Sequence, residues 1–203
     1  MRLKNVIRAI IIGGVSLLLF PIQFASAAAT AISTPVFSAP IGRAAERATK
    51  KSFGIYVGPG HSPVNPERFR GYHTGIDFET FPNEKNTAVA VSAICTGKIV
   101  RRGVISGYGG AVVQACTLNQ EPITVVYGHL SIKSVTSTVG QVLKQGTAFA
   151  ILGKGYSTET AGERKHLHLS IHKGKTVDVR GYVLKKSELK NWVDFLPYVE
   201  NKD

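Results

Sequence analysis

The run from His166 to Ile171 (His-Leu-His-Leu-Ser-Ile) alternates between polar and apolar side chains, and His172 begins the turn that we expect to follow it. Because successive side chains of a β-strand point to opposite faces, this period of two predicts a strand with its leucines and isoleucine on one face. The other face carries His166 and His168, roughly 7 Å apart. Two imidazoles side by side on a strand suit a metal ion or a proton-transfer site, although solvated surface histidines give the same pattern.

The rest of the composition also favours a β protein. The chain has 203 residues, of which 43% are hydrophobic and 21 are glycine. Val, Ile and Thr between glycines indicate short strands joined by tight turns. The stretch 139–153 has a turn, a short strand and a glycine, a pattern typical of barrel-sandwich domains. We therefore expect a mainly β, antiparallel sheet or barrel-sandwich fold, followed by a short C-terminal helix that begins near Ser187 and ends before Pro197.

The first 27 residues have the three-part layout of a secretory signal peptide. Arg2, Lys4 and Arg8 precede an apolar run over residues 9–20, and small residues at 25–27 provide a cleavage site. The apolar run is shorter than the ~20 residues of a membrane span, so we expect membrane attachment only if the segment stays uncleaved. Residues 28–52 are rich in Ala, Ser, Thr and Pro and predict a linker, and residues 53–203 predict the folded domain.

Charge and cysteine content agree with export to the periplasm, the cell wall or the medium. A formal net charge of +12 suits an anionic envelope surface. Nucleic acid is excluded as a partner because no basic run is interleaved with aromatic residues. Cys95 and Cys116 are the two cysteines, and an even count in an oxidising compartment predicts a disulfide between them.

Three separate clusters carry groups that can bind a metal: His73 and Asp77, then His129, then His166 and His168. A straight strand would separate His73 from Asp77 by roughly 13 Å, but Gly75 allows the chain to bend between them. A catalytic zinc site needs three protein ligands and an open position. Five groups therefore leave two imidazoles for proton transfer or for stabilising an oxyanion. Spacing alone does not say which imidazoles bind zinc.

Together the three clusters resemble the motifs of the lysostaphin-like (LytM-type) zinc metallopeptidases, bacterial endopeptidases that cut peptide cross-links in peptidoglycan. The resemblance covers residues 53–173. It implies an antiparallel β fold of the duplicated hybrid motif type, with a substrate groove over the sheet. It also implies zinc ligands at His73, Asp77 and His168 and catalytic imidazoles at His129 and His166. All five positions are filled in this chain, which we expect to act as a monomer on the cell-wall peptide.

Two other functions remain open at this point. The basic charge also suits a non-catalytic wall-binding or regulatory module with the same fold. Residues 139–153 are similar to lipoyl-like or sugar-phosphotransfer barrels, in which paired histidines can carry phosphate. The signal peptide and the absence of a lipoylation-type Asp-Lys turn disfavour this last reading.

Overall fold

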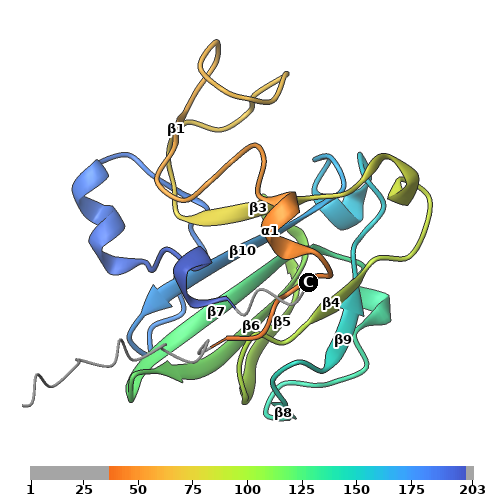
Figure 1. Cartoon of the computed structure of the whole chain (residues 1–203), viewed down its shortest axis with the longest axis vertical. Coiled ribbons are helices and arrows are strands. Elements are labelled where there is room, and N and C mark those ends of the chain that lie inside the picture. The colour runs from red at the N-terminus through yellow and green to blue at the C-terminus, as the bar shows by residue number, and fades with distance from the viewer. Residues whose placement is uncertain (1–36, 200–203) are drawn as a thin grey trace, which may run out of the picture. The chain divides into compact units, whose positions relative to one another are not determined.

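The computed structural model describes residues 37–199; the predicted signal peptide and the first part of the predicted linker lie outside this range. The named strands pair antiparallel in three sheets (Figure 1). The main sheet has the strand order β3 (Gly75–Glu79), β10 (His166–Lys173), β7 (Glu121–Leu130), β6 (Gly109–Leu118), β5 (Gly97–Ile105) and β8 (Val142–Leu143). It stays open between its edge strands β3 and β8, so the predicted antiparallel β fold is confirmed without a closed barrel in the described part of the chain.

Two smaller sheets and several short helices complete the fold. The three-stranded sheet contains β1 (Tyr56–Val57), β2 (Gly71–His73) and β11 (Tyr182–Val183), and β4 (Ala90–Ser92) pairs with β9 (Ala148–Ile151). The helices are α1 (Ala44–Arg47) and the 3₁₀ turns η1 (Pro82–Glu84), η2 (Ile132–Ser134), η3 (Thr158–Thr160), η4 (Lys186–Asn191) and η5 (Leu196–Tyr198). None of these helices is long and apolar enough to cross a membrane.

Strand β10 lies inside the main sheet, between β3 and β7. Leu167, Leu169 and Ile171 are buried in the main hydrophobic core on one face of the sheet. The strand is longer than the sequence predicted, because His172 pairs with Thr124 of β7 and is not part of a turn. The predicted strand therefore separates an apolar core from a polar face.

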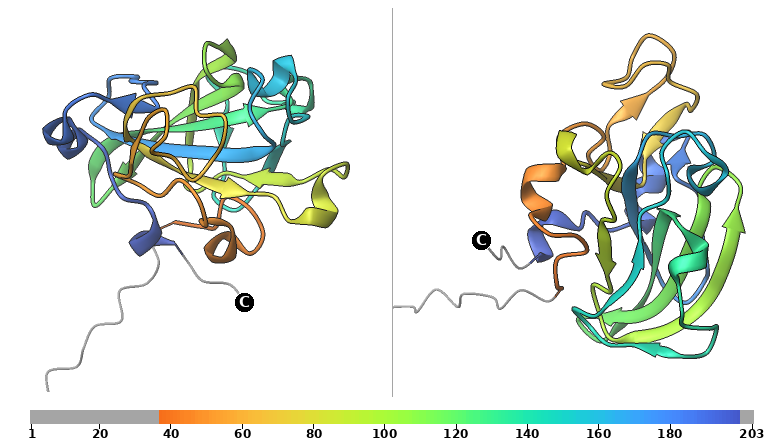
Figure 2. Two further views of the ribbon diagram at one scale, coloured as in Figure 1. Left: turned by 90° about the horizontal axis from the view of Figure 1, so that it is seen from above. Right: turned by 90° about the vertical axis from the view of Figure 1, so that its right-hand side faces the viewer.

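Segments from both ends of the described chain cover the core side of the main sheet. Phe37 and Ile41 are buried in this core, and the Phe37 ring packs on Phe195 with centroids 5.7 Å apart. Figure 2 shows α1 and strand β4 on the same side of the sheet. Residues 37–52 of the predicted linker thus contribute directly to the folded unit.

The predicted disulfide is present, whereas the predicted C-terminal helix is divided into two short segments and Pro197 lies inside the second one. Cys95, just before β5, is bonded to Cys116 of β6, which confirms the pairing. The C-terminal helix consists of the short 3₁₀ segments η4 and η5. Trp192 forms an isolated bridge with His172 of β10. Because this bridge needs extended backbone, it ends the first helical segment.

Candidate metal centre

Three donor atoms from separate strands meet on the polar face of β10. The register between β3 and β10 places Asp77 directly opposite His168, and His73 arrives from the end of β2. The atoms His73 Nε2, His168 Nδ1 and Asp77 Oδ1 lie 3.0–3.3 Å from one another. Ligands placed tetrahedrally about 2.0–2.1 Å from one zinc ion are separated by roughly 3.3 Å. The three side chains therefore have the chemistry and the spacing of a zinc-binding tripod.

Gly75 permits this arrangement for a reason that the sequence did not reveal. The sequence suggested that glycine was needed for its backbone freedom, but Gly75 does not have a positive φ. A Cβ atom at this position would lie 2.4 Å from the Leu169 carbonyl oxygen and 2.9 Å from the His168 ring. The absence of a side chain leaves room for β10 and its imidazole to approach the bend between His73 and Asp77.

Each of the three side chains also has a partner on its other side. The partners are the Ser52 carbonyl for His73 (3.2 Å), the Arg164 guanidinium for Asp77 (2.8 Å) and the Tyr108 hydroxyl for His168 (3.3 Å). Such outer contacts set the tautomer and orientation of metal ligands. His73 Nδ1 must donate its proton to the carbonyl oxygen, which leaves the lone pair of Nε2 facing the other two donor atoms.

The two remaining imidazoles lie beside this group. His166 Nδ1 donates to the Arg164 carbonyl oxygen (2.9 Å), and its Nε2 lies 3.3 Å from Asp77 Oδ2. The His129 ring lies over the His166 ring, with centroids 4.3 Å apart. His129 has φ 62°, a left-handed conformation that is uncommon outside glycine. Its Nδ1 is buried and has no hydrogen-bond partner among residues 37–199.

Burial and mutual contacts determine the charge of these side chains. Burial by itself would raise the pKa of Asp77, but the imidazoles of His166 and His73 outweigh this effect and hold the pKa well below its usual range. Burial is the main cause that lowers the pKa of His168 to about 4 and the pKa of His129 well below its usual value. Near neutral pH Asp77 is thus a carboxylate and the His168 and His129 rings are neutral, and these are the protonation states in which such side chains bind metal ions.

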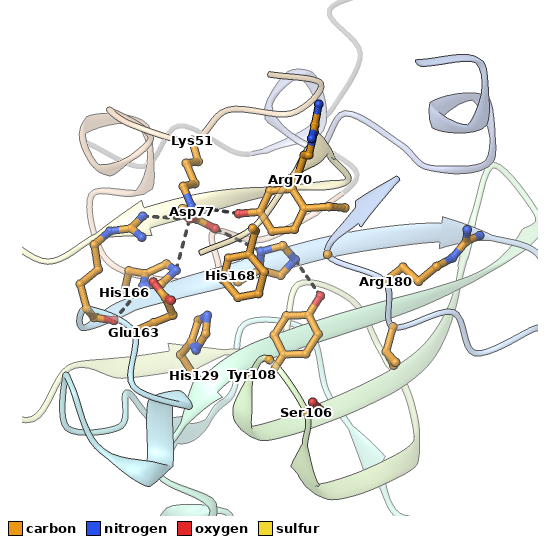
Figure 3. A pocket seen from close by; sticks show the side chains of 16 residues that line it. Lys51, Arg70, Asp77, Ser106, Tyr108, His129, Glu163, His166, His168 and Arg180 are labelled. Carbon is orange, nitrogen blue, oxygen red and sulfur yellow. Dashed lines mark hydrogen bonds and ion pairs between the residues drawn. The ribbon is translucent and has the colours of Figure 1, made fainter. Parts of the chain in front are cut away.

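The imidazoles line a cavity of about 360 Å³, a volume suited to a small ligand or a short stretch of peptide. Figure 3 shows Asp77, His166 and His168 together, with Tyr108 and His129 beside them. The cavity wall also includes Tyr182 of β11 and charged and aromatic residues from the loops around the sheet: Lys51, Phe69, Arg70, Glu163, Arg164 and Arg180.

None of the four positively charged residues of this wall was part of the sequence-based site prediction, and two of the four, Arg164 and Lys51, contact Asp77. Arg164 holds the outer oxygen of Asp77. It was detectable in principle, because it lies two residues before His166, where an extended chain would direct its side chain to the same side. Lys51 is 1% exposed, and its carbonyl oxygen accepts a hydrogen bond from the Asp77 N–H (2.9 Å). No local pattern marks Lys51, which lies in the predicted linker.

The fold and the site define a protein with a candidate metal centre of histidine and aspartate side chains beside a cavity above an antiparallel sheet. Residues 71–179 match peptidase family M23, which is more than half of the 203-residue chain. The chain belongs to this family of zinc-dependent metallopeptidases, and the resemblance to LytM-type enzymes is confirmed. A comparison with curated proteins gave no match.

Several solved structures are similar to this chain at low sequence identity. LytU is 24% identical, with 66% of this chain and 77% of that chain covered, and a TM-score of 0.47. A chain of the SpoIIQ–SpoIIIAH pore-forming complex is 18% identical, with 83% and 93% covered and a TM-score of 0.52. A zinc-containing peptidase from Vibrio cholerae is 20% identical, with 71% and 41% covered and a TM-score of 0.42. At these identities the likeness concerns the fold alone.

Proposed function

We propose that this chain is an exported zinc metalloendopeptidase that hydrolyses peptide cross-links of bacterial peptidoglycan. The observation that carries this proposal is the 3.0–3.3 Å spacing of His73 Nε2, His168 Nδ1 and Asp77 Oδ1. Asp77 and His168 line a cavity together with two further imidazoles, and His73 is buried behind them. Membership of peptidase family M23 supports a peptidoglycan substrate. The layout of the first 27 residues supports export.

In this proposal the zinc ion is held by His73, Asp77 and His168. Zinc bound there would polarise the carbonyl of the scissile peptide bond and lower the pKa of a water molecule. The Arg164 guanidinium holds Oδ2 of Asp77, so that Oδ1 remains directed at the two histidine nitrogens. The Ser52 carbonyl and the Tyr108 hydroxyl hold the two rings in the same way.

His129 and His166 are proposed to move protons and to stabilise charge. Burial keeps His129 neutral near pH 7, so it can accept a proton from the attacking water. Because Nδ1 of His166 donates to the Arg164 carbonyl, the nitrogen that can exchange a proton is Nε2, which lies 3.3 Å from Asp77 Oδ2. Once protonated, an imidazole here can stabilise the oxyanion and then return a proton to the leaving amine. The two rings lie close enough to act on one peptide bond.

The direct test combines metal analysis with digestion of purified cell walls of defined cross-link type. We expect about one zinc per chain and release of peptides that mass spectrometry assigns to cleavage at one kind of cross-link. A chelator should stop the release, and added zinc should restore it. If the metal-loaded protein pellets with walls but releases no peptide, the chain is a non-catalytic wall-binding module and the proposal is wrong.

A further inference from the structure

Four positively charged side chains line the cavity, and three of them are already paired with carboxylates of the protein. The four are Lys51, Arg70, Arg164 and Arg180. The pairs are Lys51 with Glu67 (2.7 Å), Arg164 with Asp77 (2.8 Å) and Arg180 with Asp178 (2.7 Å). Arg70 has no carboxylate partner within residues 37–199.

The Arg70 guanidinium is held on one side and free on the other. Its Nε donates to the Tyr56 hydroxyl (3.1 Å), while its two terminal amino groups have no partner in the described part of the chain. Tyr56 is opposite Tyr72 in the β1–β2 pair, and their rings pack edge to face with centroids 5.1 Å apart. The tyrosine pair thus holds an exposed guanidinium at a defined place on the cavity wall.

The carboxylates that line the same cavity are engaged elsewhere. Asp77 contacts the imidazoles and Arg164, and Glu163 is paired with Arg68. In the view of Figure 3, Arg70 extends away from the imidazoles and lies on the opposite side of them from Ser106. An anion bound by Arg70 would therefore leave the imidazoles accessible to a peptide bond.

We propose that Arg70 forms a carboxylate-binding subsite, so that the enzyme prefers acidic cross-links in which a free carboxylate lies near the scissile amide. The inference rests on the proposed peptidase function. The two terminal amino groups of arginine form a rigid fork that binds a carboxylate through two charge-assisted hydrogen bonds. A cross-link made of neutral residues, or one whose carboxylate is amidated, lacks this interaction. The subsite thus discriminates between classes of cross-link through charge.

The test uses two soluble cross-linked peptides that differ in one group. Both contain a D-alanyl amide to a diamino acid, which carries either a free carboxylate or a carboxamide next to the scissile bond. The zinc-loaded wild type should prefer the carboxylate peptide. Arg70→Gln should lower kcat/KM for that peptide about 10- to 100-fold, mainly through KM, and change the value for the carboxamide peptide less than about twofold. Tyr56→Phe should cause a smaller loss with the same selectivity.

Arg180→Gln is the matched control, because it removes a cavity-wall cation that is already paired with Asp178 and Glu188. We expect it to leave the ratio of the two kcat/KM values unchanged. Equal losses for both peptides in Arg70→Gln, or the same selective loss in Arg180→Gln, would overturn the subsite.

Calorimetry of both peptides on the wild type separates the proposed Arg70 subsite from the proposed peptidase function. If neither peptide is cleaved but the carboxylate peptide binds more tightly through Arg70, the Arg70 subsite is supported and the proposed peptidase function is wrong. If neither peptide is cleaved and both bind equally, the Arg70 subsite is wrong as well.

Discussion

Two groups of buried polar side chains lie on the main sheet, and they differ in how completely the protein satisfies them. The core cluster consists of Gln114, Tyr127 and the backbone of Ile94 and Cys95. The Tyr127 hydroxyl donates to Gln114 Oε1 (2.8 Å) and accepts from the Ile94 N–H (2.9 Å), and Gln114 Nε2 donates to the Cys95 carbonyl (2.8 Å). Burial raises the pKa of Tyr127, so the core cluster stays neutral.

The site cluster, made of His73, Asp77, His129, His166 and His168, is buried to a similar degree but is charged and incompletely paired. His129 Nδ1 has no hydrogen-bond partner within the described range. The three donor atoms of His73, Asp77 and His168 lie within 3.3 Å of one another. A closed network of neutral hydrogen bonds stabilises a fold, whereas a buried charge with unpaired neighbours costs stability. The comparison indicates that the core cluster serves the fold and that the site cluster serves chemistry.

The largest expected effect separates two histidines inside the site cluster. His168→Ala removes a proposed ligand and should lose both zinc and activity, by at least about 1,000-fold. His166→Ala should lose about 100-fold or more in activity but keep most of its zinc. Metal analysis and wall digestion of both variants check this. Equal zinc loss in the two would contradict the division of roles.

Acid should destabilise the metal-free protein through the site cluster. The folded pKa of His168 is about 4, below the unfolded value near 6.5, so the unfolded state binds more protons between these pH values. The free energy of unfolding should therefore fall as the pH decreases from about 6.5 to 4, by about 3 kcal/mol from this residue. Denaturation of chelator-treated protein at several pH values measures this decrease in the free energy of unfolding. In His168→Gln the decrease should be smaller, and an unchanged decrease would assign it to other groups.

Gly75→Ala tests whether space at the bend controls metal binding. The added Cβ would meet the Leu169 carbonyl and the His168 ring, so β10 must shift and zinc affinity should fall about 100-fold. Zinc competition with a coloured chelator measures this change. Gly42→Ala is the control, because a Cβ there meets no atom within 4 Å. Wild-type affinity in Gly75→Ala would show that the strands adjust without disturbing the site.

The smallest effect concerns the core cluster. Tyr127→Phe leaves Gln114 Oε1 and the Ile94 N–H without their partner and should lower the free energy of unfolding by about 1–3 kcal/mol. Zinc content and activity should stay at wild-type levels. The control is Tyr198→Phe, since the Tyr198 hydroxyl has no hydrogen-bond partner among residues 37–199. Loss of zinc in Tyr127→Phe would contradict the assignment of separate roles to the core cluster and the site cluster.

The sequence determined features that depend on local pattern or on residue type. The alternation over residues 166–171 predicted strand β10 and its two faces because side-chain direction in a strand follows a period of two. With two cysteines in the chain, the disulfide could form in one way. The five candidate metal and proton-transfer residues were found because few residue types perform these tasks, and the structure brings them into one cluster.

Only the tertiary structure decided how these residues meet. The opposition of Asp77 and His168 comes from the register of two strands that are far apart in sequence. The supporting contacts from Ser52 and Arg164 come from loop segments that the folded sheets bring beside the site. Gly75 is required by the close approach of a neighbouring strand, which no local rule for glycine reveals. Local sequence sets side-chain direction and chemistry, but distances of about 3 Å between remote atoms are set by the packing of the whole fold.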